Sequence, residues 1–182
     1  MHPDGSDPAT VLQDPLGNTI GDLAWSPDGA WIAYVVDRTL LRVVRPDGTG
    51  DRLLSRIEDS DTIGFWQPAW TPDGSRIVYL GSETHQNAPR NAPTWTLRIM
   101  AVAAGETESS SSVVAVVGEC FCLGFSPSFA VAPDGSAYLV STLAMPLPDG
   151  RTQDGLFVVD AKTLQPRSLS GTVATVTWQP RP

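Results

Sequence analysis

The hydrophobic and polar positions of this chain alternate in short runs that are separated by turn residues. Apolar runs rich in Val, Ile, Leu and Tyr stand at 31–36, 76–81 and 137–142, each within two residues of a preceding Pro-Asp-Gly sequence. Runs of this length and composition predict β-strands. No segment combines a 3.6-residue apolar period with helix caps. The pattern therefore predicts an all-β protein.

One turn sequence recurs ahead of these apolar runs, as Trp-Ser-Pro-Asp-Gly at 25–29, Trp-Thr-Pro-Asp-Gly at 70–74 and Val-Ala-Pro-Asp-Gly at 131–135. Proline presets φ at the first corner, aspartate hydrogen-bonds to the nearby backbone, and glycine accepts the left-handed conformation that closes a tight hairpin. We expect both tryptophans to be core residues and the first two glycines to have positive φ. The residues that carry this structural motif are Trp25, Pro27, Asp28, Gly29, Trp70, Pro72, Asp73, Gly74, Pro133, Asp134 and Gly135.

Each repeat unit is expected to contain four strands. They are expected at 21–26, 31–36, 40–45 and 51–55, then at 64–71, 76–81, 95–101 and 112–117, and then at 125–132, 137–142, 155–159 and 165–169. The single domain 1–182 would thus hold three blades, at about 21–56, 64–118 and 125–170, with partial strands at 9–13 and 173–178. Four-stranded units at a period of about 40–60 residues predict a β-propeller or part of one. A β-sandwich also has regular short strands, but it does not explain why the same turn returns at the same place.

The repeat resembles the TolB-type WD40-like (PD40) propeller repeat. The resemblance is carried by Trp-[Ser/Thr]-Pro-Asp-Gly-x-x-Ile-[Ala/Val]-Tyr in the first two units, followed in the first by a strand at 41–44 and a Pro-Asp-Gly corner at 46–48. It covers essentially the whole chain and is loose in the third unit, where Val131 replaces the tryptophan. Complete propellers of this family have six or more blades, so the resemblance implies a partial propeller here. It implies no particular ligand, because such propellers occur as periplasmic accessory proteins, sensor modules and gating domains of peptidases.

The charge of the chain limits the classes of partner that it is expected to bind. There are 12 Lys and Arg residues against 20 Asp and Glu residues, a net charge of −8, and no basic stripe that would bind nucleic acid. No apolar run approaches the roughly 18 residues that a membrane span needs. Residues 1–4 carry no signal segment, so a cytoplasmic location is expected unless a signal or anchor was removed, in which case the location would be periplasmic or extracytoplasmic.

The sequence contains no motif of a known catalytic or cofactor site. It lacks a Gly-x-Ser-x-Gly elbow, a phosphate-binding glycine loop and a His-Glu-x-x-His zinc helix. Cys120 and Cys122 are two residues apart, a spacing that seldom reaches disulfide geometry, so buried free thiols are expected. The acidic stretch 58–61 lacks the twelve-residue ligand loop of a calcium site and is expected to be solvated. We therefore expect no enzyme activity, no cofactor and no metal within this chain.

Recognition is expected at one end of the blades. Antiparallel order places the Pro-Asp-Gly turns at 3–5, 27–29, 46–48, 72–74 and 133–135 at one end and the longer connections 56–63, 82–94 and 143–154 at the other. Elaborated loops on a rigid scaffold commonly carry binding residues, although such insertions are also tolerated without a function. The candidate binding residues on this long-loop face are His85, Arg90, Asp59, Asp61, Arg151 and Asp154.

Two functions from different classes remain open. The first is a non-catalytic binding or scaffold module that recognises a protein, peptide or small ligand through its long-loop face. The second is the regulatory or sensor propeller of a larger enzyme, such as a prolyl-oligopeptidase-like hydrolase or a sensor kinase. Self-association through open blade edges is also expected, because unpaired strand edges readily recruit another chain.

Overall fold

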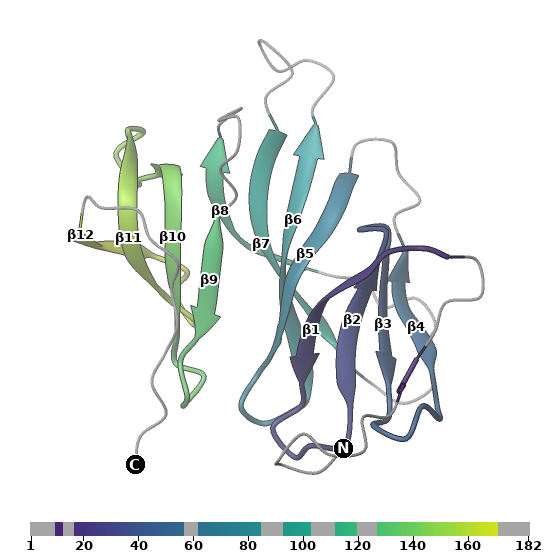
Figure 1. The fold of residues 1–182 in the computed structure, drawn as a ribbon. Helices are drawn as coiled ribbons and strands as arrows, with labels where there is room; N and C mark the ends of the chain where they lie inside the picture. Colours follow the sequence, from purple (N-terminus) through teal and green to yellow (C-terminus); the bar gives the residue numbers. More distant parts are fainter. Residues whose placement is uncertain are drawn as a thin grey trace.

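The computed structural model describes residues 10–12, 17–56, 62–84, 93–102, 112–119 and 127–170. Within these ranges every regular element is a β-strand, and the strands form three four-stranded antiparallel sheets, in the orders β1-β2-β3-β4, β5-β6-β7-β8 and β9-β10-β11-β12 (Figure 1). The bounds are β1 Ile20–Trp25, β2 Ile32–Val36, β3 Leu40–Val44, β4 Arg52–Arg56, β5 Thr62–Trp70, β6 Arg76–Thr84, β7 Pro93–Ala101, β8 Ser112–Glu119, β9 Ser128–Val131, β10 Ala137–Pro146, β11 Thr152–Asp160 and β12 Pro166–Ser170. The predicted fold class, an all-β partial propeller of three four-stranded blades, is confirmed.

All twelve strands expected in the three units are found, each overlapping its expected range. Of the expected terminal strands, residues 10–12 of the segment 9–13 are described and lie outside the strands, and 173–178 lies outside the described residues. The long connection expected at 143–154 is wrong. Strands β10 and β11 continue to pair through Met145 with Gln153 and Pro146 with Thr152, which leaves only a short turn between them.

That short turn is a further Pro-Asp-Gly corner, at 148–150, and it lies at the end of the sheets where none was expected. Its glycine has φ +80°, and Gly150 N donates to Leu147 O at 3.0 Å. The corner at 27–29 is built in the same way, with Gly29 N donating to Ser26 O at 2.9 Å. Gly29 and Gly74 have φ values of +70° and +69°, which confirms the predicted turn conformation.

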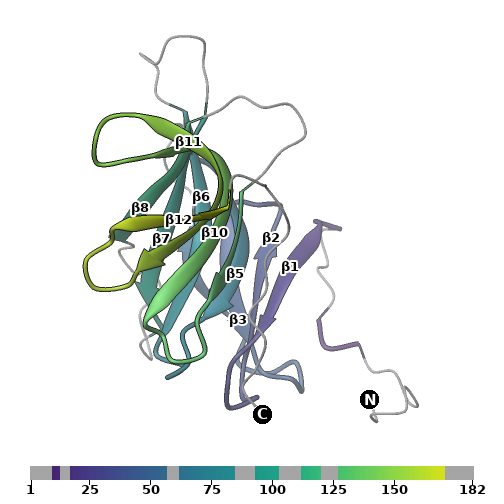
Figure 2. The ribbon, with the colours of Figure 1, turned by 90° about the vertical axis from the view of Figure 1, so that its left-hand side faces the viewer.

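The three sheets lie face to face, with their first strands together. β1 contacts β5 and β5 contacts β9, so the first strand of every sheet lies on the inner side, while the strand order places β4, β8 and β12 at the opposite edges. Figure 2 shows this stack turned by 90°, with the third sheet nearest the viewer and β1 at the margin. This arrangement of strands is that of three successive propeller blades.

The seams between the sheets use the same register positions each time. We call the row that faces the preceding sheet the leading row and the row that faces the following sheet the trailing row. At the first seam, the trailing row is Ala24, Ala33 and Val43 and the leading row is Trp70, Ile77 and Met100. At the second seam, the trailing row is Ala69, Val78 and Ile99 and the leading row is Val131, Tyr138 and Val159. A small residue on the inner strand of each trailing row leaves room for the larger residue opposite.

The two tryptophans of the repeat have different environments. Trp70 is 8% exposed, and its Nε1 donates to Ala24 O of the preceding sheet at 3.0 Å. Trp25 occupies the equivalent position of the first sheet, but it is 60% exposed. The expectation that Trp25 is a core residue is therefore wrong, because this side chain points to the side on which the described residues form no sheet before the first one.

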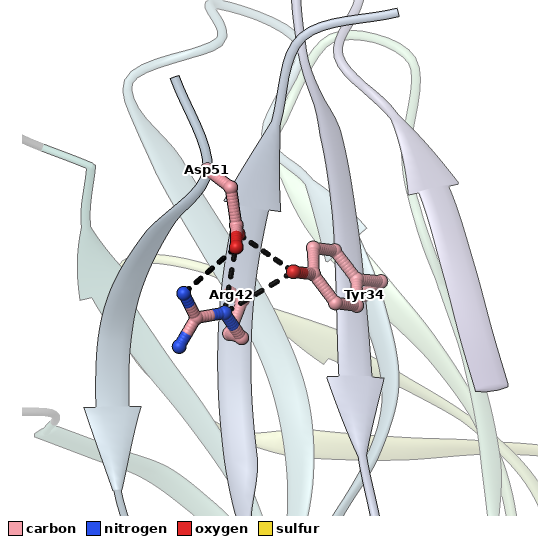
Figure 3. Close-up of polar contacts among 3 residues, drawn as sticks. All are labelled: Tyr34, Arg42 and Asp51. Carbon is pink, nitrogen blue, oxygen red and sulfur yellow. Dashed lines mark hydrogen bonds and ion pairs between the residues drawn. The ribbon is translucent and has the colours of Figure 1, made fainter. Parts of the chain in front are cut away.

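The same side of the first sheet carries a polar cluster of three residues. Tyr34 of β2 donates to Asp51 Oδ1 at 2.6 Å, and Arg42 of β3 binds Asp51 through Nε at 3.1 Å and Nη2 at 2.8 Å (Figure 3). Burial, and then the hydrogen bond to Asp51, raises the pKa of Tyr34, and the same carboxylate raises the pKa of Arg42. Because all three side chains are paired with one another, the cluster ties β2 and β3 to the start of β4.

Candidate functional site

The long-loop end of the sheets contains a cavity between the first and second blades. Its volume is about 420 Å³, within the range typical of small-ligand pockets. Strands β1, β2 and β5 and the turn between β2 and β3 supply its walls. The lining residues are Thr19, Gly21, Asp22, Val35, Asp37, Arg38 and Trp66. The walls thus combine two carboxylates, one guanidinium group and one indole ring.

The turn between β2 and β3 places Asp37 and Arg38 at this cavity. Thr39 N donates to Val36 O at 3.0 Å, and both central residues have left-handed φ values, +46° for Asp37 and +61° for Arg38. Turns with two left-handed central residues favour asparagine, aspartate or glycine there. Arg38 is therefore an unfavourable residue for the turn, since a side chain in the left-handed region costs about 1 kcal/mol.

Two β-bulges open the inner strands at the same cavity. The pairing of β1 with β2 shifts between Gly21 and Ala24, and that of β5 with β6 shifts between Trp66 and Ala69, which is the equivalent place in the second repeat. Asp22 and Gln67, the equivalent residues inside these bulges, each have φ +48°. Bulges are common beside functional sites because they redirect side chains. Here they bring Asp22 to the cavity.

Contacts within the first blade and between the first two blades fix the charged groups of the cavity. Asp22 Oδ2 accepts a hydrogen bond from Gln67 N at 3.3 Å, and Asp37 Oδ1 accepts one from Thr19 N at 2.8 Å. The guanidinium carbon of Arg38 lies 3.9 Å from the ring centroid of Trp66. Such a cation–π contact stabilises by about 0.5–1 kcal/mol at an exposed site. These contacts hold the groups in place before any ligand arrives.

Trp66 has an unusual position among these residues. Within the described part of the chain, its Nε1 is buried and has no hydrogen-bond partner. A Cβ atom added at Gly64 would lie 3.1 Å from this nitrogen and 3.2 Å from Arg38 Cβ, so the indole fits closely against the glycine. A buried N–H group without a partner is costly, which sets this seam apart from the ordinary packing elsewhere.

A second and larger cavity, of about 600 Å³, lies at the opposite end, between the second and third blades. Its charged residues include Asp73, Arg76 and Lys162. Asp73 is engaged within its own turn, where it accepts hydrogen bonds from Thr71 Oγ1 at 2.6 Å and Ser75 Oγ at 2.8 Å. These bonds lower the pKa of Asp73 to about 2. The carboxylate therefore serves the turn, and this cavity is the weaker candidate for a ligand site.

The six predicted binding residues do not lie at the first cavity as far as the structure describes them. His85, Arg90, Asp59 and Asp61 are outside the described residues, as are Cys120 and Cys122. Arg151 forms an ion pair with Asp149 in its own turn, at 2.5 Å between Nη2 and Oδ2, and lowers the pKa of that aspartate. Asp154 Oδ1 accepts a hydrogen bond from Ala144 N at 2.9 Å. Both described residues are thus held within the β10–β11 hairpin.

Sequence reasoning missed the residues that line the cavity. The relevant signals were small: Asp22 and Gln67 both stand three residues before the tryptophan of their repeats, and the pair Asp37-Arg38 stands between two apolar runs. Over the described ranges, no group of three or more His, Cys, Asp or Glu side chains is arranged to hold a metal ion. The same ranges contain no helix with the length and hydropathy that a membrane crossing requires.

The comparisons with known proteins agree with this architecture. No family model and no curated protein matches the chain. A protein from Agrobacterium tumefaciens assigned as TolB has a similar structure, with a TM-score of 0.56 and 14% identity over 88% of this chain and 48% of that one. A chain of hydrazine synthase from Kuenenia stuttgartiensis gives a TM-score of 0.52 and 15% identity over 76% of this chain and 39% of that one.

At these identities the similarity is one of fold. The chain spans about half the length of the TolB structure and less of the hydrazine synthase chain. The predicted resemblance to a TolB-type propeller is confirmed at the level of fold, and assignment to the WD40-like repeat family stays a prediction. The described part of the chain thus forms an arc of three propeller blades with a charged, aromatic-lined cavity between the first two.

Proposed function

We propose that this protein is a non-catalytic binding module that recognises a positively charged group of a peptide, protein or small ligand in the cavity between its first two blades. The observation that carries the proposal is the composition of that cavity. Asp22, Asp37 and Arg38 all line it, and all three have left-handed φ values. Backbone conformations that most side chains avoid are concentrated at functional sites, where the rest of the structure maintains them.

The charge of the site favours a cationic ligand. Two carboxylates and one guanidinium group leave the lining residues with one net negative charge. The guanidinium of Arg38 already stacks on Trp66, so the carboxylate oxygens not used by the backbone are the natural acceptors for a ligand ammonium or guanidinium group. The net charge of −8 on the whole chain attracts the same kind of ligand over a longer range.

An NMR titration tests the proposal. The ¹⁵N-labelled protein is titrated with Nα-acetyl-arginine amide and, separately, with Nα-acetyl-glutamate amide. We expect the arginine probe to shift the amide signals of Asp22, Asp37 and Arg38 and the indole N–H signal of Trp66, and the glutamate probe to leave them unchanged.

Matched variants locate the binding site. Asp22→Asn and Asp37→Asn keep an amide oxygen for the bonds from Gln67 N and Thr19 N but remove the charge, so each should weaken binding about two- to fivefold, as for the loss of one partly exposed ion pair. Asp47→Asn is the control, because Asp47 makes the same kind of backbone bond, to Thr49 N at 2.9 Å, in a turn at the other end. Equal responses to both probes, or shifts confined to the cavity around Arg76 and Lys162, would refute the proposal.

A second candidate function is that of a regulatory or sensor propeller within a larger enzyme. The observation in its favour is that one structure with this fold belongs to hydrazine synthase and that the chain spans 39% of it. Sequencing the coding region on both sides of these 182 codons tests this candidate. A Gly-x-Ser-x-Gly elbow or kinase signature in the same reading frame would support it, and stop codons close to both ends would exclude it.

A further inference from the structure

Arg38 is the one positively charged side chain among the described residues that line the cavity between the first two blades. Its guanidinium group lies over the Trp66 ring. Within the described part of the chain this group forms no hydrogen bond or ion pair, although Asp22 and Asp37 line the same cavity. The cavity therefore contains opposite charges that do not neutralise one another by direct contact.

Arginines elsewhere in the described chain do pair with a nearby aspartate. Arg42 Nη2 lies 2.8 Å from Asp51 Oδ2, and Arg151 Nη2 lies 2.5 Å from Asp149 Oδ2. Arg151 and Asp149 are neighbours in a turn, as Arg38 is a neighbour of an aspartate in its own turn. An unpaired guanidinium group beside two carboxylates is thus a particular property of this cavity.

The backbone around Arg38 accounts for this property. The residue is held in the left-handed region, with φ +61°, and its carbonyl oxygen accepts a hydrogen bond from Phe65 N of β5 at 2.8 Å. The turn is therefore attached to the second blade, and the side chain extends over Trp66 of that blade. A turn that only had to connect two strands would be more stable with glycine at this position.

The carboxylates of the cavity are also only partly used. Asp22 Oδ2 and Asp37 Oδ1 each accept one backbone hydrogen bond, and the second oxygen of each has no partner among the described residues. The side chains of Asp22, Asp37 and Arg38 are all exposed. The cavity thus offers acceptors for a cation and donors for an anion on adjoining residues.

We propose that the ligand of this cavity is zwitterionic, with a carboxylate close to its positive charge. The proposal rests on the proposed function, which assigns the ligand cation to Asp22 and Asp37, and it adds Arg38 as the group that binds the ligand carboxylate. A guanidinium group can stack on an aromatic ring and still bind a carboxylate through two parallel hydrogen bonds. An anion without a cation is not expected to bind, because the lining residues carry one net negative charge.

A free amino acid and the C-terminal basic residue of a peptide share this chemistry, and two pairs of probes distinguish them. Nα-acetyl-arginine and its amide differ by one carboxylate and represent the end of a peptide, and alanine and alaninamide represent a free amino acid. Each probe is titrated into the full ¹⁵N-labelled chain at about pH 6, where an α-amino group is protonated. We expect the carboxylate to strengthen binding about two- to fivefold in the pair that matches the ligand, as for one partly exposed ion pair.

Arg38→Gln separates the two halves of the site. Glutamine keeps a polar side chain but removes the charge, so the advantage of the carboxylate probe should disappear. The amide probe should bind somewhat more tightly, because a positive charge beside the ligand cation is gone. These opposite changes exclude simple misfolding of the turn, which would weaken both probes. Arg151→Gln is the matched control, because Arg151 is an exposed turn arginine that does not line this cavity, and the ratio of affinities should stay the same.

The outcomes separate this proposal from the proposed function. Equal affinities for the carboxylate and amide probes in both pairs would overturn the zwitterionic ligand and leave the cation site intact. An advantage of the carboxylate that persists in Arg38→Gln, or that Arg151→Gln removes, would also overturn it. Failure of every probe to bind would refute the proposed function as well.

Discussion

Trp70→Ala and Trp25→Ala truncate the same side chain at the same place in two successive sheets, and we expect very different losses of stability. Trp70 is 8% exposed and Trp25 is 60% exposed, a difference of 52 percentage points. For a side chain of about 250 Å², at about 25 cal/mol per Å² of apolar surface, this difference corresponds to about 3 kcal/mol. The hydrogen bond from Trp70 Nε1 to Ala24 O adds about 1 kcal/mol. Trp70→Ala should therefore lower the free energy of unfolding by about 3–4 kcal/mol more than Trp25→Ala does.

Urea unfolding followed by far-ultraviolet circular dichroism measures both losses without relying on the fluorescence that the substitutions change. The protein is kept at about 1 µM, so that association contributes little to the unfolding free energy. Losses that agree within about 1 kcal/mol would refute the reasoning, because they would show that the Trp25 indole is as buried in the isolated chain as the Trp70 indole is.

Three further predictions concern single turns. Gly48→Ala should lower the free energy of unfolding by more than Gly29→Ala, which should cost about 1 kcal/mol. Both glycines have positive φ, but only at Gly48 would the new Cβ meet a backbone atom, Val11 O at 2.5 Å. Equal losses in thermal melts would show that Val11 does not cover this turn. The pKa of Asp73 is lowered from 3.8 to about 2, so its stabilising contribution is present above about pH 4 and is lost as the pH falls toward 2. Asp73→Asn should therefore reduce the fall of the unfolding free energy between about pH 4 and about pH 2. An unchanged pH profile would contradict the role of Asp73 in its turn. Arg38→Gly should leave the urea midpoint nearly unchanged, because glycine removes the cost of a left-handed side chain and this offsets the lost stacking on Trp66. Arg38→Ala should lower the midpoint, because alanine loses the stacking and keeps that cost. Similar midpoints for the two variants would count against the left-handed turn at Arg38.

The sequence was sufficient for features that depend on a few neighbouring residues. The positive φ of Gly29 follows from the Pro-Asp-Gly corner alone, and the strand that follows it is a short apolar run. Trp25 shows where this reasoning ends. Its local sequence is nearly that of Trp70, and its exposure depends on which sheet lies opposite, which no local pattern encodes.

The candidate site was harder to predict for a related reason. The cavity is formed by two bulged strands and a turn from different repeats, and Asp22 reaches it only because its backbone leaves the regular strand conformation. The prediction of a loop at 143–154 was wrong because β10 contains an irregularity at Ala144, which has φ +56°, and then resumes its pairing with β11. An alternating pattern does not reveal that a strand continues beyond a bulge.

The repeated seam positions have a consequence for how such a protein can grow. The leading rows of the second and third sheets meet the same kind of trailing row: the third sheet presents Val131, Tyr138 and Val159 to Ala69, Val78 and Ile99 as the second presents its own row to the first. When a gene duplicates or deletes one whole repeat, the sheets of the protein therefore still meet through contacts of a type that it already contains, and no new kind of interface is needed. Arrays of this kind gain or lose stability in steps of one unit and one junction. Chain length in this architecture is set by copy number, while the residues that give each member its own ligand remain free to diverge.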